Sequence, residues 1–353
     1  MNPVKKYVLP TVTALVLLAV FFSPLAVSAK AQPRLEGYHP LAEVYEEIKA
    51  IQRANPDMVT IHEIGESVEG RPIMALEIKK DDGVGRPEAL ITANIHASEV
   101  LSSRVALGVA NRLSRDYDSD PWITSILDRT DVWIVPVVNP DGYYTAIAGG
   151  GKGIRKNSNG VDLNRNFPLA PGARSIHPLS GNRFKWSSYY MGPEQLSEPE
   201  TRAIAGLVSE HDFYVSINGH TVAGKFLYPH GFTRKPAAHQ DEFQEMGQAF
   251  VSKQPKWQYS VQISCSWYPT LGDMDDYLYM EHGIMSVTIE HGTVKHNLKY
   301  ALRHPKWFWV ANPHDPGPWV ENDGGAILSA VEKALEITGG EPFDPAECHP
   351  VKR

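Results

Sequence analysis

Cysteine is scarce in this chain. Its 353 residues include only Cys265 and Cys348. Two cysteines allow one disulfide bond in an oxidising compartment, but they are too few for a scaffold held together by disulfides. The sequence leaves open whether the two residues pair or remain separate thiols.

Excess basic charge is also missing. The net charge is −7 at pH 7, which gives no positive field for nucleic acid, and we expect no nucleic-acid partner. The chain has no internal repeat, no low-complexity tract and no linker that would separate two domains. Its 42% hydrophobic and 21% charged residues are typical of a globular protein. One large domain is therefore expected.

Long hydrophobic runs are limited to one, at residues 12–22. That run is shorter than the roughly 20 residues of a membrane-spanning helix. Lys5 and Lys6 precede it and Val27-Ser28-Ala29 follows it, a pattern typical of a secretory signal peptide. We expect residues 1–31 to be the signal and 32–353 the catalytic domain, with its core at about 38–337. The mature protein is then secreted or periplasmic, without stable membrane association; an uncleaved anchor is the alternative.

Apolar runs alternate with amphipathic segments along the rest of the chain. Ser197 is the expected cap of the third helix, and Pro140-Asp141-Gly142 bounds the fourth strand. The alternation predicts an α/β fold: a single domain with a mixed, mostly parallel central sheet flanked by helices. The expected strands are 59–65, 71–79, 88–93, 132–138, 213–217 and 284–290, and the expected helices are 40–55, 101–113, 197–209 and 325–337.

Three polar residues, His96, His220 and Glu290, fall at the ends of predicted strands. Ligands of such sheets gather at the carboxyl ends of the strands. His96 and Glu99 stand three positions apart at a strand-to-helix turn, so an imidazole and a carboxylate can converge on one cation such as Zn²⁺. An isolated pair of this kind is more often a surface histidine and a glutamate favoured by the dipole at a helix N-terminus.

Further motifs follow in a fixed order. They are His96-Ala97-Ser98-Glu99, Pro136-Val137-Val138-Asn139-Pro140-Asp141-Gly142, Gly153-Ile154-Arg155-Lys156-Asn157, Gly160-Val161-Asp162-Leu163-Asn164-Arg165-Asn166-Phe167, Ser216-Ile217-Asn218-Gly219-His220 and Ser286-Val287-Thr288-Ile289-Glu290. This series is more specific than any one of its members, and it resembles the M14 zinc carboxypeptidases, the carboxypeptidase A and B family, over residues 38–337.

The resemblance implies a role for each of several residues. One Zn²⁺ per chain would be held by His96, Glu99 and His220, with a fourth position open for water; His282, His291 and His296 are rival ligands near Glu290. Glu290 would act as general acid/base, and Arg155 would stabilise the oxyanion. Asn164 and Arg165 would bind the terminal carboxylate of the substrate, and Tyr268 would close over the bound C-terminal residue.

Asp275 stands seven residues after Tyr268. In carboxypeptidase B-like members an aspartate at this position selects Lys or Arg, whereas carboxypeptidase A-like members have an apolar residue. The hypothesis is therefore a preference for basic C-terminal residues. Asp273 and Asp276 are close neighbours of Asp275 in the sequence.

The leading prediction is an exported, monomeric zinc metallocarboxypeptidase that acts on the C termini of peptides or proteins. A cell-wall stem-peptide amidase or endopeptidase is a rival, because diaminopimelate also has a basic side chain and a free carboxylate for Asp275 and Arg165. A catalytically inactive peptide-binding homologue is a third possibility. It would be favoured by loss of a site residue such as Glu290, and none of them is lost.

Overall fold

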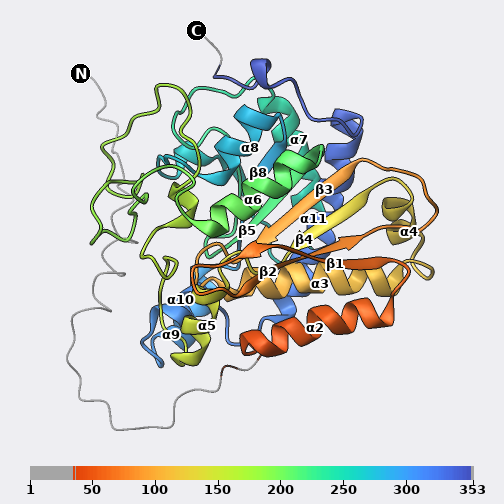
Figure 1. The fold of residues 1–353 in the computed structure, drawn as a ribbon, viewed down its shortest axis with the longest axis horizontal. Coiled ribbons are helices and arrows are strands. Elements are labelled where there is room, and N and C mark those ends of the chain that lie inside the picture. The colour runs from red at the N-terminus through yellow and green to blue at the C-terminus, as the bar shows by residue number, and fades with distance from the viewer. Residues whose placement is uncertain (1–34, 36, 351–353) are drawn as a thin grey trace, which may run out of the picture.

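An eight-stranded sheet forms the centre of the molecule, in the order β1-β2-β4-β3-β5-β8-β6-β7 (Figure 1). The computed structural model describes residues 35 and 37–350, so the predicted signal at 1–31 lies outside the described residues. The strands are β1 (Val59–Glu66), β2 (Pro72–Ile78), β3 (Glu88–Ala93), β4 (Asp131–Val135), β5 (Phe213–Thr221), β6 (Lys225–Tyr228), β7 (Ser260–Ile263) and β8 (Met285–His291).

The predicted mixed, mostly parallel sheet is confirmed. The central pairs β3–β4, β3–β5 and β5–β8 are parallel, and so is the pair β6–β7. The pairs β1–β2, β2–β4 and β6–β8 are antiparallel. The carboxyl ends of β3, β5 and β8 consequently meet at one edge, where side chains from distant parts of the sequence come together.

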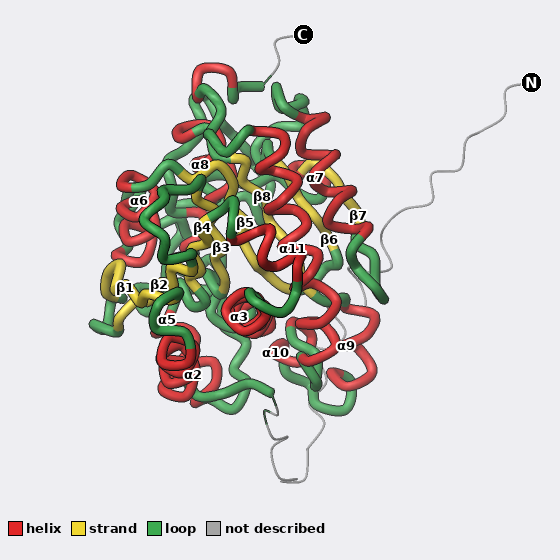
Figure 2. Tube along the Cα trace, turned by 90° about the vertical axis from the view of Figure 1, so that its right-hand side faces the viewer, coloured by secondary structure: helices red, strands yellow, loops and turns green. Residues whose placement is uncertain are grey.

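Helices cover both faces of this sheet. Figure 2 shows α2, α3 and α11 on one face and α6 and α8 on the other. The longer helices are α2 (Leu41–Ala54), α3 (Val100–Asp116), α5 (Pro140–Ala148), α6 (Pro199–Glu210), α7 (Gln240–Ser252), α8 (Met274–His282), α9 (Val294–Ala301) and α11 (Gly317–Thr338); α4 (Pro121–Leu127) and α10 (Trp307–Ala311) are shorter.

Two apolar cores result from this layering. Leu90 packs in the core that includes Ile204 of α6, whereas its neighbour Ile91 packs in the core that includes Val105 of α3. Successive side chains of a strand point to opposite faces, so a strand covered on both faces is mainly apolar, and its polar residues need hydrogen-bond partners. The continuous apolar runs in the sequence are therefore the central strands.

Some local predictions were wrong. The strand predicted at 132–138 ends at Val135, and Pro140-Asp141-Gly142 begins α5, because the Asn139 side chain accepts a hydrogen bond from the Gly142 amide at 2.9 Å and caps the helix. Ser197 is not the cap of α6. Glu198 occupies that position, and the Ser197 hydroxyl donates to the Glu198 carboxylate at 2.7 Å.

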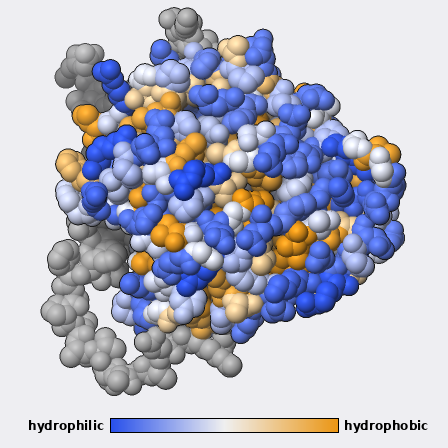
Figure 3. Space-filling view, in the orientation of Figure 1, coloured by the Kyte–Doolittle hydropathy of each residue, from blue (hydrophilic) through white to orange (hydrophobic). Residues whose placement is uncertain are grey.

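Cys265 and Cys348 are both buried free thiols, which resolves the alternative left open by the sequence. Among the described residues, no helix combines the length and the apolar character needed to span a bilayer. On the face shown in Figure 3, hydrophilic residues predominate and apolar residues gather in small groups.

Candidate metal and substrate site

The parallel register brings His220 and Glu290 side by side at the edge of the sheet. His220 on β5 is the direct partner of Glu290 on β8, and Ala93 at the end of β3 is the partner of Gly219. His96 lies in the turn that follows β3, and Glu99 caps the start of α3. All four functional side chains thus come from three adjacent strand ends.

The turn at residues 94–99 is held by buried side-chain amides. Asn94 has a φ of 56°, a backbone conformation that asparagine tolerates better than most residues. The backbone carbonyls of the turn accept hydrogen bonds that fix its shape. The side-chain amide of Asn94 donates to the His96 carbonyl at 3.2 Å. The Asn139 amide donates to the Ile95 carbonyl at 3.3 Å, and the Asn312 amide donates to the Ser98 carbonyl at 2.7 Å.

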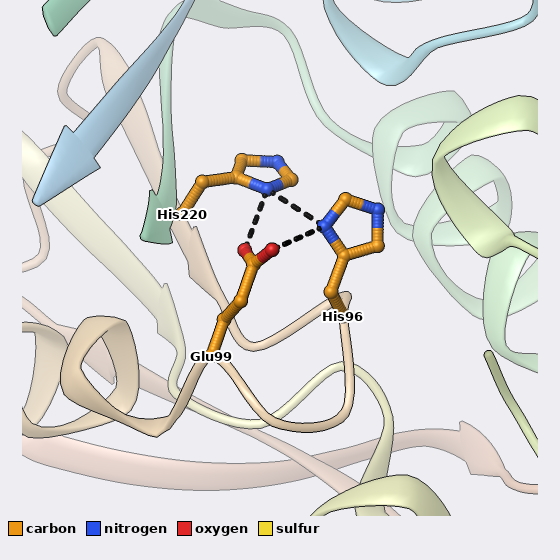
Figure 4. A group of neighbouring side chains, drawn as sticks. All are labelled: His96, Glu99 and His220. Carbon is orange, nitrogen blue, oxygen red and sulfur yellow. Dashed lines mark hydrogen bonds and ion pairs between the residues drawn. The ribbon is translucent and has the colours of Figure 1, made fainter. Parts of the chain in front are cut away.

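His96, Glu99 and His220 converge on one point (Figure 4). The two oxygens of Glu99 lie 3.0 Å from His96 Nδ1 and 3.0 Å from His220 Nδ1, and the two Nδ1 atoms are 3.1 Å apart. All the potential ligand atoms lie within 4.8 Å of one another, and this is the only such group found among the described residues. Two imidazoles and a carboxylate are a suitable donor set for Zn²⁺.

Asp162 contacts this group from the other side of His96. Its Oδ1 lies 3.2 Å from His96 Nε2, and its Oδ2 accepts from Arg155 Nε at 2.7 Å. Burial alone would raise the pKa of Asp162, but the Arg155 charge and the hydrogen bond to His96 outweigh it, and the pKa is lowered. An ionised Asp162 accepts the Nε2 proton of His96, which leaves the Nδ1 lone pair facing Glu99 and His220.

Glu290 is buried beside the three-residue group, and its Oε2 has no hydrogen-bond partner among the described residues. Burial and the negative charge of Glu99 raise its pKa above the usual glutamate value. A carboxyl group with a raised pKa can both take up and return a proton near neutral pH.

Arg155 lies at the mouth of the same cleft. Its Nε is occupied by Asp162, whereas its buried Nη2 has no hydrogen-bond partner in the described part of the chain. The Tyr189 ring lies 5.1 Å from the guanidinium carbon. The guanidinium is therefore fixed in place with a donor left over for an oxygen atom of a ligand.

Arg165 is buried, and its charge helps to lower the pKa of Asp162 and to limit the rise that burial causes in the pKa of Asp273, but its guanidinium makes no direct contact with a carboxylate among the described residues. Its Nε and Nη2 donate to the Leu179 carbonyl at 3.3 and 3.1 Å, and Nη1 donates to the Asn164 carbonyl. The Asn164 side chain is oriented by the Met274 amide, which donates to its Oδ1 at 2.9 Å. A buried cation without an anionic partner is costly, so this position suits an anionic ligand.

Tyr268 lies over this part of the cleft. Its ring is parallel to that of His177, with centroids 6.3 Å apart, and the Arg165 guanidinium carbon is 6.0 Å from the Tyr268 centroid. Burial raises the pKa of the Tyr268 hydroxyl, so it remains protonated and can donate a hydrogen bond at neutral pH.

Asp275 forms the inner wall of the cleft. Its carboxylate accepts from Asn218, from Ser286 Oγ at 2.7 Å and from Thr288 Oγ1 at 2.5 Å. Burial and the charge of Asp273 raise the pKa of Asp275 to about 6. Because every donor is neutral, the carboxylate has no counter-ion within the described residues, and a cationic ligand group would supply one.

A family model described as zinc carboxypeptidase matches residues 44–307. The chain belongs to the zinc carboxypeptidase family. Its sequence is 32% identical over 262 residues to mouse carboxypeptidase A4, covering 70% of this chain and 60% of that protein. It is 34% identical over 220 residues to mouse carboxypeptidase A2, covering 59% of this chain and 50% of that protein. The chain thus spans between half and 60% of the length of these two relatives.

Solved structures with the same fold support the architecture of this zinc carboxypeptidase family member. Bovine thrombin-activatable fibrinolysis inhibitor, in complex with tick carboxypeptidase inhibitor, superposes with a TM-score of 0.71 at 24% identity, covering 86% of this chain and all of that chain. Carboxypeptidase A from Helicoverpa armigera superposes with a TM-score of 0.67 at 22% identity, covering 88% of this chain and 76% of that chain. At these identities the likeness concerns the fold.

Eight of the nine predicted site residues of this family member line one cleft, and the ninth, Glu99, contacts two of them. Among the rival histidines, His291 is bound to Asp323 at 2.7 Å instead. Asp162 was not assigned a role from the sequence. Its position two residues before Asn164 in the same motif was the available signal, but only the fold brings its carboxylate to both His96 and Arg155.

Proposed function

We propose that this protein is a zinc-dependent carboxypeptidase that removes the C-terminal residue of peptides or proteins. The observation that carries the proposal is a single cleft in which the group His96, Glu99 and His220 lies beside the unpartnered carboxylate of Glu290 and the buried guanidinium of Arg165. Release of single residues from peptides with a free C-terminus tests it.

The residues divide the hydrolysis between them. Zn²⁺ held by His96, Glu99 and His220 would polarise the scissile carbonyl and acidify a water molecule. Glu290 takes the proton of the attacking water and returns it to the leaving amine, which its raised pKa favours. Arg155 donates from Nη2 to the carbonyl oxygen as negative charge develops there.

Arg165 and Asn164 bind the terminal carboxylate of the substrate in this proposal. A bidentate contact would give the buried guanidinium the anionic partner that it otherwise lacks. Tyr268, above the guanidinium, covers the bound residue. Requirement for a free carboxylate is what restricts such an enzyme to the end of a chain.

The proposed substrates end in Lys or Arg, because Asp275 presents an uncompensated carboxylate to the side-chain pocket. Export is part of the same proposal, with residues 1–31 as a cleaved signal, and the N-terminal residue of the mature protein tests it. The proposed mature unit is a monomer.

Asp275→Asn is expected to lower kcat/KM for a peptide ending in Lys by about 100-fold at pH 7.5, with little change for the same peptide ending in Leu. The reason is loss of a Coulomb attraction of about 3 kcal/mol, the value for two unit charges roughly 6 Å apart at an effective dielectric constant near 20. In the unmodified protein, the Lys-to-Leu ratio should fall as the pH drops below 6, because Asp275, with its pKa raised to about 6, becomes protonated and neutral.

The appropriate measurement is the ratio of kcat/KM for the Lys peptide to kcat/KM for the Leu peptide, since pH effects on Glu290 or the metal group act on both peptides. Asp57→Asn, at an exposed position, is the matched control. A Lys-to-Leu ratio that stays constant from pH 7.5 to 5 and survives Asp275→Asn would contradict the assignment of Asp275.

A further inference from the structure

The loop between Arg165 and α6 carries an exposed apolar surface beside the cleft. Ile176 is fully exposed, Phe184 is 59% exposed and Trp186 is 84% exposed. We refer to Phe184 and Trp186 as the aromatic rim. In Figure 1 this yellow-green loop extends away from the sheet on the left. Clustered apolar side chains that remain in water commonly mark a binding surface.

The rim is held in place by its own hydrogen bonds. The Asn182 amide donates to the Tyr189 carbonyl at 3.0 Å, and the Asn182 side chain accepts from the Phe184 amide at 3.0 Å. The Ser187 amide donates to the Phe184 carbonyl at 2.9 Å. The rings of Phe184 and Trp186 are stacked, with centroids 5.4 Å apart and planes inclined by 20°. The two aromatic faces are therefore presented to solvent by an ordered turn, which lowers the entropy cost of binding.

A continuous surface leads from the cleft to the rim. Arg155 lines both the cleft and a neighbouring hollow at residues 153–158. Ser188 lines that hollow and also the hollow of about 600 Å³ along the rim. Tyr189 connects the rim hollow with the cleft. It lines the rim hollow, and the centroid of its ring lies 5.1 Å from the guanidinium carbon of Arg155.

The position of the rim limits what can occupy it. This step rests on the proposed function: a substrate whose terminal carboxylate is held at Arg165 has no residues beyond that point, so any part that leaves the cleft is upstream of the scissile bond. Within the described residues, the hollow along the rim has no Asp, Glu, Lys or Arg in its lining. An uncharged, apolar group therefore fits it best.

We propose that the aromatic rim binds apolar side chains of the substrate upstream of the scissile bond, and that the enzyme prefers peptides with such residues near their C-terminus. The C-terminal pocket and the rim then select different parts of one ligand. A basic last residue is selected inside the cleft, and an apolar segment before it is selected outside.

The experiment compares three substrates that share the same last two residues: a blocked dipeptide, a hexapeptide with Leu and Phe upstream, and a hexapeptide with Ser at those positions. The variant is Phe184→Ser combined with Trp186→Ser. Val84→Ser, 59% exposed on a separate loop, is the matched control. For the apolar hexapeptide the double variant should raise KM about tenfold and leave kcat unchanged, because a buried aromatic contact contributes at least that much to binding.

For the dipeptide, kcat/KM should be the same in the double variant, the control and the unmodified protein. The same should hold for the Ser hexapeptide. Equal kcat/KM for the two hexapeptides in the unmodified protein, or an equal loss on all three substrates in the double variant, would overturn the role of the rim alone. Failure of the unmodified protein to cleave any of the three substrates would overturn the proposed function and this inference with it.

Discussion

Glu290→Gln is expected to lower kcat by about 10² to 10⁴-fold, the usual contribution of a general acid/base. Glutamine has nearly the same shape but cannot take a proton from water at neutral pH. Since Oε2 of Glu290 has no partner among the described residues, the substitution breaks no hydrogen bond of the fold at that atom. Steady-state rates on a peptide with a free C-terminus give the effect.

Two further measurements separate loss of chemistry from loss of the site. KM and the zinc content per chain should stay within about twofold of the unmodified protein, because Glu290 is not one of the three proposed ligands. Glu281→Gln, at an exposed position on α8, is the control and should keep full activity. A Glu290→Gln enzyme with more than a tenth of the original kcat would rule out the assigned role.

Arg165→Met is expected to lower kcat/KM for a free-acid peptide by about 100-fold or more, because loss of one partner from a buried charge pair costs about 2–5 kcal/mol. Methionine fills much of the same volume without a charge. The same peptide with an amidated C-terminus should be cleaved slowly by both proteins. The preference for the free acid over the amide should therefore nearly disappear in the variant.

That preference is the readout to use, because Arg165 also donates to the Leu179 and Asn164 carbonyls and its loss will affect the local structure. A local distortion lowers both rates, whereas loss of the carboxylate contact lowers only the rate on the free acid. Arg174→Met, exposed on the same loop, serves as the matched control. An unchanged preference in Arg165→Met would show that the carboxylate binds elsewhere.

The centre of the fold could be predicted from the sequence because its signals are strong. Strands β3, β4, β5 and β8 are buried along nearly their whole length, and each contains strongly apolar residues, as at 132–135 in β4 and 213–215 in β5. His96, His220 and Glu290 interrupt or end such runs, where a polar side chain must have a partner or a function. The order of the motifs then supplied the residue choices that spacing alone could not make.

Other features depend on contacts that the sequence does not reveal. Strands β6 and β7 are only four residues long and lie at one edge, so pairing decides their structure. The start of α5 has turn-forming residues, yet the Asn139 cap makes it helical. Gly142 is also needed there, since a Cβ at that position would lie 2.5 Å from the Cβ of Ala97 in the metal-binding turn.

We propose that a metal held by His96, Glu99 and His220 is required to hydrolyse the last peptide bond of a chain with a free C-terminus. Mass spectrometry of peptides ending in Lys, Arg, Phe or Glu, as free acids and as amides, tests it most directly when the purified protein is used with and without a chelator. We expect loss of single C-terminal residues that is far faster from the free acids than from the amides, is abolished by the chelator and is restored by Zn²⁺. Cleavage that is indifferent to the chelator, or that occurs inside the amidated peptides, would contradict the claim.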